Sequence, residues 1–181
     1  MARAAAKEPI LLIEEIARRS RAHAAGLPQQ QEVRVEWSGI GFRVGGLRVL
    51  APMGEVKEIL TPPPLSRVPG TKAWVLGIAN VRGNLLPVMD LNGYLHGRRT
   101  TRGKRTRVLV INHHGVFAGL MVDEVMGLRH FELESRTFER SDVDPAVAPY
   151  LERGFRVEDE TWAVFSIRKL AESPLFLQVA M

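Results

Sequence analysis

The sequence contains no cysteine, few aromatic residues and no long apolar run, and each of these absences excludes a class of protein. Without cysteine the chain can form neither a disulfide nor a thiolate metal site, which fits a reducing compartment. Aromatic residues make up 7% of the chain, too few for the interleaved aromatic and basic residues of an RNA-binding sheet. No stretch reaches the roughly 20 apolar residues that span a bilayer. We therefore expect a cytoplasmic protein without direct membrane insertion.

The N-terminal segment is too polar for a secretory signal, since Glu14 and Glu15 interrupt its apolar run after ILLI. Residues 8–25 instead show apolar positions at helical spacing, with Pro9 suited to the first turn. A polar linker follows, so we expect residues 1–35 to form a helical extension ahead of the main domain. This helix either covers an apolar patch or docks a partner.

The excess of positive charge is confined to one short segment. The formal net charge is +5, and residues 98–107, RRTTRGKRTR, contribute six basic side chains and no acidic one. Subtracting +6 from +5 leaves −1 for the rest of the chain, so a basic face is not expected elsewhere. The segment is either a solvated loop or a contact for an acidic partner surface. A small nucleic-acid-binding barrel that uses this segment is the alternative function.

From Trp37 onward the pattern is that of many short strands separated by turn residues. Ten apolar runs broken by such residues indicate a sandwich or barrels, and not a parallel α/β sheet. A weak internal repeat, FRVGGLRVLAPMGEVKEI against LVINHHGVFAGLMVDEVMGL, divides the ten strands between two lobes of five. The expected strands are 37–44, 47–51, 55–60, 76–80, 84–89, 107–112, 116–122, 125–130, 151–157 and 161–167.

The predicted domain is all-β and spans residues 36–172, with a first lobe over about 36–97 and a second over about 107–172. The basic segment lies where the lobes join, and residues 173–181 form a C-terminal tail. Closing each lobe as a small barrel would remove exposed strand edges. A short helix is expected after the last strand of each lobe, and Asp90 before LNGYL is well placed to cap the first.

The usual signatures of catalysis and metal binding are missing from the sequence. It has no G-x-x-x-x-G-K-[ST] phosphate loop and no G-x-S-x-G elbow. His113 and His114 are adjacent at an expected hairpin turn, where extended side chains would point to opposite sides. Asp123 and Glu124 face apart for the same reason, so neither pair suits one substrate or metal. We expect no catalytic residue, no cofactor and no metal; an enzyme with a metal at the two histidines is a third hypothesis.

Four stretches of the chain match, in order, the pattern of a known family. They are GFRVGGLRVLAPMGEVKEIL, VPGTKAWVLGIANVRGNLLPVMDL, RVLVINHHGVFAGLMVDEVMGL and the late WAVFSIRKL. The chain thus resembles CheW-like adaptor domains of bacterial chemosensory systems. WSGIGFRVGG, FAGLMVDEVMGL and the helix before AAGLP point to the branch that serves type IV pilus twitching motility. The family's core signature, G-x-x-N-x-R-G-x-x-x-P-x-x-D-L, is met by Gly77, Asn80, Arg82, Gly83, Pro87, Asp90 and Leu91.

The resemblance implies two five-stranded, SH3-like β-barrels packed around a shared apolar core, and a scaffolding function without catalysis. Such adaptors couple the cytoplasmic tip of methyl-accepting chemoreceptors to the regulatory domain of a CheA-type histidine kinase. The resemblance also implies recruitment to membrane-associated receptor arrays, with no nucleic acid as a partner. The basic segment and the N-terminal helix are not part of the minimal family pattern.

The resemblance further implies two binding surfaces. A groove between the lobes would bind the receptor, and a kinase surface would lie near the turn after VDEV, where Leu128 is the candidate. Strand alternation predicts Val56 and Glu58 on one face, and we expect Glu58 to pair with Arg82 across the groove. Gly83 would permit the turn, because glycine reaches positive φ at little cost. The implied receptor-groove residues are Val56, Glu58, Asn80, Arg82, Gly83, Val108 and Val110.

Overall fold

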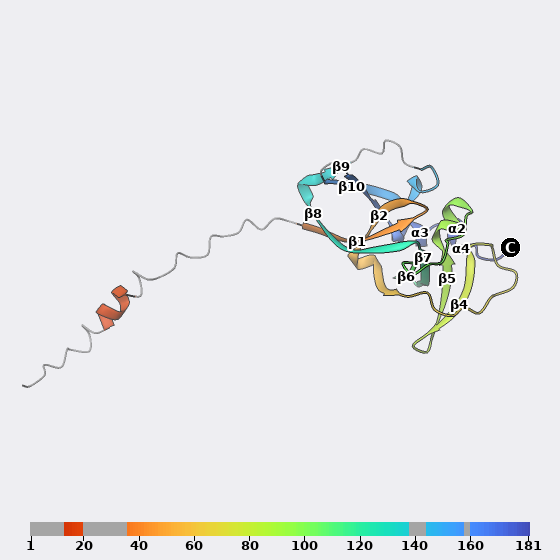
Figure 1. The fold of residues 1–181 in the computed structure, drawn as a ribbon, viewed down its shortest axis with the longest axis horizontal. Helices are drawn as coiled ribbons and strands as arrows, with labels where there is room; N and C mark the ends of the chain where they lie inside the picture. Colours follow the sequence, from red (N-terminus) through yellow and green to blue (C-terminus); the bar gives the residue numbers. More distant parts are fainter. Residues whose placement is uncertain (1–12, 20–35, 138–143, 158–159) are drawn as a thin grey trace, which may run out of the picture. The chain divides into compact units, whose positions relative to one another are not determined.

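The structure, a computed structural model, describes residues 13–19, 36–137, 144–157 and 160–181. The chain divides into two compact units, Met1–Arg34 and Val35–Met181. In the first unit, residues 13–19 form an α-helix, drawn in red in Figure 1. The rest of the helix predicted over 8–25 lies outside the described residues. Within the described part of the chain, we find no helix long and apolar enough to cross a membrane.

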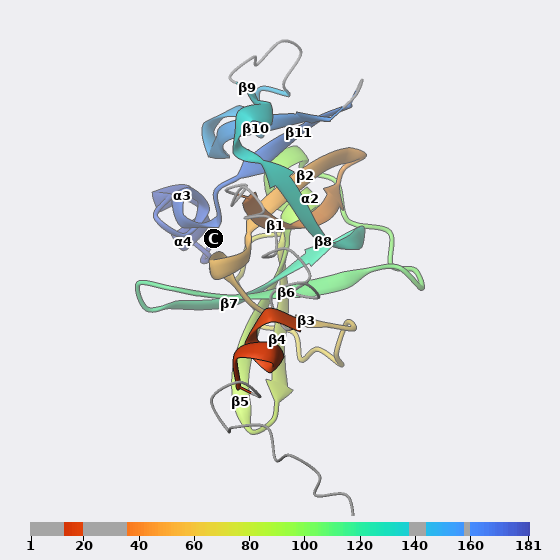
Figure 2. The same cartoon turned by 90° about the vertical axis from the view of Figure 1, so that its left-hand side faces the viewer.

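The second unit is mostly β, and its strands form two sheets (Figures 1 and 2). All ten predicted strands are present, and β9 is an additional short strand that the sequence pattern does not predict. The six-stranded sheet has the order β8-β1-β2-β11-β10-β9, and the five-stranded sheet has the order β3-β6-β7-β5-β4. The strands are β1 Glu36–Val44, β2 Leu47–Pro52, β3 Val56–Leu60, β4 Val75–Val81, β5 Asn84–Asp90, β6 Arg107–His113, β7 Val116–Val122, β8 Glu124–Glu132, β9 Arg136–Thr137, β10 Leu151–Val157 and β11 Glu160–Phe165.

Short helices occupy the ends of several strands. Asp90 caps α2, because its side chain accepts a hydrogen bond from the Gly93 N–H, as predicted. Ser166 caps α3 by accepting from the Lys169 N–H, so β11 ends before the predicted limit at residue 167. The α-helices are α2 Leu91–His96, α3 Ile167–Ala171 and α4 Pro174–Leu177, and the 3-10 helices are η1 Met53–Glu55, η2 Leu133–Ser135 and η3 Ala148–Tyr150.

The two sheets do not divide the chain sequentially, as the predicted lobes do. β1 and β2, expected in the first lobe, pair with β8 and β11 from the second half of the chain. β6 and β7, expected in the second lobe, pair with β3 and β5 from the first half. The contacts β2–β11 and β5–β7 are parallel ladders, which a repeat of consecutive hairpins does not predict. Each sheet therefore contains strands from both sides of the basic segment 98–107.

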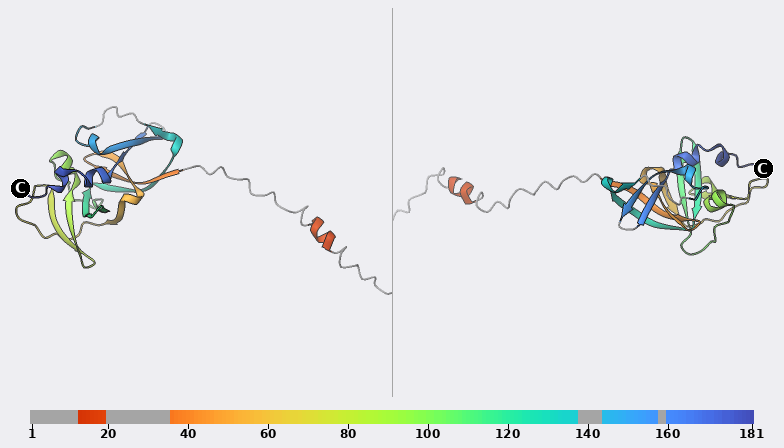
Figure 3. Two further views of the ribbon diagram at one scale, coloured as in Figure 1. Left: turned by 180° about the vertical axis from the view of Figure 1, so that it is seen from behind. Right: turned by 90° about the horizontal axis from the view of Figure 1, so that it is seen from above.

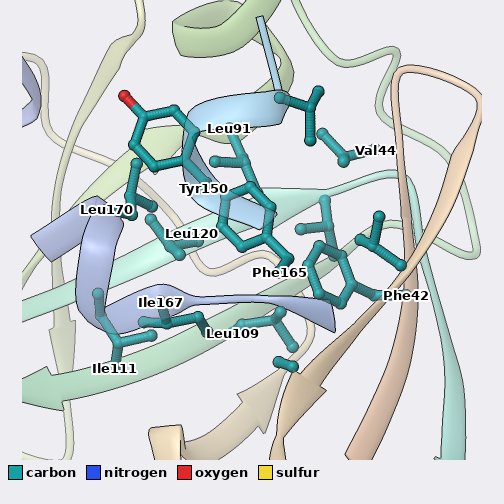
Figure 4. Packing of buried hydrophobic residues seen from close by; sticks show 14 of the residues in the cluster. Phe42, Val44, Leu91, Leu109, Ile111, Leu120, Tyr150, Phe165, Ile167 and Leu170 are labelled. Atoms are coloured by element: carbon teal, nitrogen blue, oxygen red, sulfur yellow. The ribbon is translucent and has the colours of Figure 1, made fainter. Parts of the chain in front are cut away.

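Buried apolar residues form three clusters, one between the sheets and one on the other face of each sheet. The shared core takes Phe42 and Phe165 from the six-stranded sheet and Leu109 and Ile111 from the five-stranded sheet (Figure 4). The prediction of a shared apolar core is therefore confirmed. The five-strand core comprises Ala79, Leu86, Val88, Val108, Val110 and Met121, and the six-strand core comprises Leu50, Phe131, Phe155, Trp162 and Val164.

Three hairpins close with two-residue loops in which both residues have positive φ, which is the geometry of a type I′ turn. The loops are Gly45-Gly46, Arg82-Gly83 and His114-Gly115, and φ is 52° at Arg82 and 46° at His114. The Cβ atom makes this conformation unfavourable for L-residues, and Asn and Asp adopt it more readily than the others. The Arg82 and His114 turns therefore store backbone strain that Gly45-Gly46 does not.

A candidate partner-binding surface

Arg82 lies at the tip of the β4–β5 hairpin, which extends from the five-stranded sheet (Figures 2 and 3), and it binds Glu58 on β3. Its Nη2 donates to Oε1 of Glu58 at 2.6 Å, so the predicted pair is present. The side chain of Arg82 is 76% exposed and that of Glu58 is 31% exposed. An ion pair this open to water stabilises the fold by about 0–1 kcal/mol. Its main effect is to fix the position of one exposed guanidinium.

This ion pair also joins the two ends of the five-stranded sheet. β3 and β4 are the outermost strands in the order β3-β6-β7-β5-β4. Glu58 lies on β3, and Arg82 directly follows β4, so the two edges approach each other at this point. The sheet is therefore strongly curled, in the manner of a small barrel.

Asn80 and Gly83 support the backbone beneath Arg82. The Gly83 N–H donates to Oδ1 of Asn80 at 2.9 Å. Gly83 has a φ of 84°, and a Cβ added there would meet open space. Backbone conformation, and not crowding, therefore requires glycine at this position. Two predicted groove residues thus position the arginine through the turn.

Val56 and Glu58 lie on opposite faces of β3, contrary to the prediction from strand alternation. Val56 is paired with Ile111 and Glu58 with Val110, so two steps along β3 match one step along β6. The extra residue, Lys57, makes a β-bulge. Because directly opposed residues share a face, Val56 turns to the shared core, where it packs. The bulge turns Glu58 to the other face, toward the β4–β5 hairpin.

Val108 and Val110 are core residues and do not line a groove. Val108 is 0% exposed and Val110 is 3% exposed, and both pack in the five-strand core. Side chains with almost no accessible surface cannot contact a partner, so the prediction of direct contact is wrong for both. β6 is buried on both faces, and such a strand reads as one continuous apolar run in the sequence.

Two exposed apolar side chains share the five-stranded sheet with the ion pair. Ile59 on β3 is 40% exposed and Leu85 on β5 is 68% exposed. Leu85 pairs with Asn80 across the hairpin, and the sequence prediction does not include it. The available signal was the doublet of Leu85 and Leu86, because neighbouring strand residues face apart and both are buried only in a strand that is covered on both faces.

Leu128, the predicted kinase contact, lies on β8 at one edge of the six-stranded sheet. Its side chain is 46% exposed. The preceding residue, Gly127, has a φ of 84°, and the β1–β8 register shifts beside it. This irregularity presents Leu128 on a bent edge strand. The two predicted surfaces therefore lie on different sheets.

The adjacent histidines do not form a metal centre with the neighbouring carboxylates. The His113 and His114 rings lie 4.2 Å apart between centroids, because His114 occupies the turn and is not extended. One carboxylate near His113 is that of Glu172, with 3.6 Å between Nε2 and Oε1. Where the structure describes the chain, no group of three or more His, Asp or Glu side chains is placed to hold a metal. Glu124 is instead paired with Arg43 and Arg105.

Comparisons with known proteins converge on one family. The family model described as "CheW-like domain" matches residues 38–174. Protein PilI of Pseudomonas aeruginosa is 47% identical over 173 residues, which cover 96% of this chain and 97% of PilI. Chemotaxis protein CheW of Helicobacter pylori is 29% identical over 133 residues, 74% of this chain and 76% of that protein. The crystal structure of the scaffolding protein TtCheW from Thermoanaerobacter tengcongensis has the same fold, with a TM-score of 0.63 and 21% identity over 72% of this chain and 89% of TtCheW.

Proposed function

The chain belongs to the CheW-like domain family, and from this premise we propose that it is a non-catalytic adaptor of a chemosensory pathway. It couples the cytoplasmic tip of a chemoreceptor to a CheA-type histidine kinase, at receptor arrays on the cytoplasmic side of the membrane. The observation that carries the proposal is the 47% identity to PilI over 96% of the chain. The same observation favours the pathway of type IV pilus twitching motility over a flagellar one.

A scaffolding function agrees with how the chain uses two of its carboxylates, the buried Asp90 and the half-buried Glu55. Asp90 caps α2 and accepts hydrogen bonds from Thr100. Oε2 of Glu55 accepts from the N–H groups of Ile167 and Arg168 at the start of α3. Burial raises the pKa of Glu55, and these two hydrogen bonds act in the opposite direction. Both carboxylates thus stabilise helix ends, which leaves neither placed as an acid or base for a substrate.

The receptor surface that we propose consists of the Arg82–Glu58 pair with Leu85 on the same hairpin as Arg82. A receptor tip is a helical hairpin, which offers an apolar stripe with polar edges. Glu58 holds Arg82 through one nitrogen, so the other guanidinium N–H groups can donate to an acceptor on the receptor. Such a charge contributes chiefly to partner choice and to the association rate. Leu128 on the other sheet serves the kinase, so both partners can bind one adaptor.

Arg82→Asn is expected to weaken receptor binding about tenfold, the effect of losing one charge-assisted hydrogen bond. It creates an Asn-Gly turn, which is the preferred sequence for the type I′ geometry present here. The free energy of unfolding should therefore stay the same or rise, by up to about 1 kcal/mol. Calorimetric titration with a receptor cytoplasmic fragment measures the first quantity, and urea unfolding measures the second.

The matched control for this variant is His114→Asn, which creates an Asn-Gly turn in the other strained hairpin. It should give a similar change in the free energy of unfolding and leave receptor affinity within about twofold of wild type. Unchanged receptor affinity for Arg82→Asn, or an equal loss of affinity for both variants, would show that Arg82 does not contact the receptor.

Leu128→Arg is expected to weaken binding of the kinase regulatory domain about tenfold, because it places a charge in an apolar contact. Receptor affinity should not change, since Leu128 lies on the other sheet from Arg82. Val157→Arg is the control, because Val157 has a similar exposure of 44% on the same sheet. If Leu128→Arg and Val157→Arg reduce the amount of kinase recovered in a pull-down equally, Leu128 is not part of the kinase surface.

A further inference from the structure

A pocket of about 420 Å³ at one end of the five-strand core combines three arginines with apolar side chains. We call it the arginine pocket. Leu65 and Leu76 pack against the five-strand core and Met121 belongs to it, so these residues form an apolar wall. The arginines that line the pocket are Arg67, Arg99 and Arg102, and all three are exposed.

The backbone beside Arg67 is fixed by the neighbouring strand. Ser66 exchanges two backbone hydrogen bonds with Ile78 on β4, each 2.9 Å between nitrogen and oxygen. This bridge holds the loop after β3 against the edge of the five-stranded sheet. Arg67 therefore projects from an anchored position and not from a mobile loop tip.

The loop that carries Arg99 and Arg102 is anchored by a buried contact. Thr100 lies between them, is 7% exposed, and donates to Asp90 from both its N–H and its hydroxyl at 2.8 Å. The basic segment 98–107 is thus not simply a solvated loop, because its central part is tied to the end of β5. The two anchored loops fix the backbone from which the three arginine side chains extend, so binding would not have to order the backbone there.

The electrostatic balance of the arginine pocket is positive. Three arginines and the carboxylate of Asp90 line it, which gives +3 − 1 = +2. Asp90 is 1% exposed, and both its oxygens accept hydrogen bonds from Gly93 and Thr100. Among the described residues, none of the three arginines has a carboxylate within ion-pair distance, whereas Arg82 and Arg168 do. Like charges held together in this way favour an anionic ligand.

We propose that the arginine pocket binds an acidic segment of a partner protein. A Glu or Asp carboxylate would lie among Arg67, Arg99 and Arg102, and a neighbouring apolar side chain would pack on Leu65 and Leu76. Inorganic phosphate would not use the apolar wall, and a nucleic acid would lack an aromatic platform for its bases here. This surface is a third contact, separate from Arg82–Glu58 and from Leu128, and it does not depend on either.

The test measures binding of short fluorescein-labelled peptides to the full chain by fluorescence anisotropy. One peptide carries alternating Glu and Leu between Gly-Ser spacers, a second has Gln in place of Glu, and a single-stranded oligonucleotide of equal length is the third probe. The Glu peptide should bind at least about tenfold more tightly than either of the others, because it alone supplies both carboxylates and apolar groups.

Two double variants with the same change in net charge locate the binding site. Arg99→Gln with Arg102→Gln should weaken binding of the Glu peptide about tenfold or more, because both side chains line the pocket. Arg98→Gln with Lys104→Gln removes two charges from the same loop outside the pocket, and should change affinity less than about twofold. Arg67→Gln, in the other loop, is an independent second variant. Equal losses in both double variants, equal binding of the Gln peptide or tighter binding of the oligonucleotide would each overturn the proposal.

Discussion

Gly77→Ala is expected to lower the free energy of unfolding by about 3 kcal/mol or more. A Cβ at Gly77 would lie 2.3 Å from the backbone oxygen of Ser66 and 2.9 Å from its carbonyl carbon. Backbone atoms cannot rotate away as a side chain can, so the loop would have to leave the edge of β4. That movement breaks the two hydrogen bonds between Ser66 and Ile78. Gly77 also has a φ of 138°, a conformation that alanine adopts only with strain.

Gly46→Ala separates crowding from backbone strain in this experiment. Gly46 also has positive φ, 89°, but nothing lies within 4 Å of its added Cβ. Its substitution should therefore lower the free energy of unfolding by only about 1–2 kcal/mol, because backbone strain is then the only cost. Urea unfolding followed by tryptophan fluorescence gives both values. A Gly77→Ala variant no less stable than Gly46→Ala would mean that the approach of Ser66 does not require glycine.

Asp90→Ala is expected to lower the free energy of unfolding by about 3 kcal/mol, because each buried donor left without an acceptor costs about 1–3 kcal/mol. Asp90 is 1% exposed. It accepts from the Gly93 N–H at 3.0 Å, and from the N–H and hydroxyl of Thr100 at 2.8 Å. The substitution leaves three donors without an acceptor, at the start of α2 and in the loop that carries the arginine pocket. The loss should appear in urea unfolding.

Ser166→Ala is the comparison for Asp90→Ala, because both residues are buried caps of short helices. Ser166 is 0% exposed and its hydroxyl accepts only from the Lys169 N–H, at 3.3 Å, among the contacts described. Losing this neutral cap should lower the free energy of unfolding by about 1 kcal/mol. If the two variants unfold at the same urea concentration, Asp90 acts only as a helix cap and its bonds to Thr100 contribute little.

The family signature combines residues that fix the backbone in and around the β4–β5 hairpin with one exposed arginine at its tip. Gly77 permits the close approach of the Ser66 loop, Asn80 accepts from the turn, and Gly83 supplies positive φ. Asp90 ties the end of β5 to α2 and to the basic segment. Arg82 differs from these four, because its side chain is largely exposed and strains the backbone. Strain retained at an exposed side chain agrees with a binding role, since folding alone would favour Asn there.

The strand positions could be predicted from the sequence because they follow local rules. Turn residues such as Gly45-Gly46 and alternating apolar residues mark where each strand begins and ends. The assignment of strands to sheets could not be predicted, because the parallel ladders β2–β11 and β5–β7 join segments without any local signal. The internal sequence repeat correctly indicated a succession of hairpins. It gave no information on which strands of different hairpins pair with each other.

The candidate site was predicted in part for similar reasons. The Glu58–Arg82 pair followed from the resemblance to the family, and the structure contains it. The face of Val56 was predicted wrongly, because a single-residue bulge at Lys57 reverses the alternation and leaves no mark in a five-residue strand. The arginine pocket could not be predicted from the sequence. It brings Arg67 next to Arg99 and Arg102, which the whole β4–β5 hairpin separates from Arg67 along the chain.

The exchange of strands between the sheets has a consequence for how the chain is made. β2 gains its second neighbour only when β11 has been synthesised. The five-stranded sheet is complete by Val122, yet the shared core against it is not complete until Phe165 and Ile167 have been synthesised. Contacts this distant in sequence form slowly and late. A chain that ends before β11 therefore lacks one neighbour of β2 and part of the shared core, so neither sheet is expected to be stable by itself.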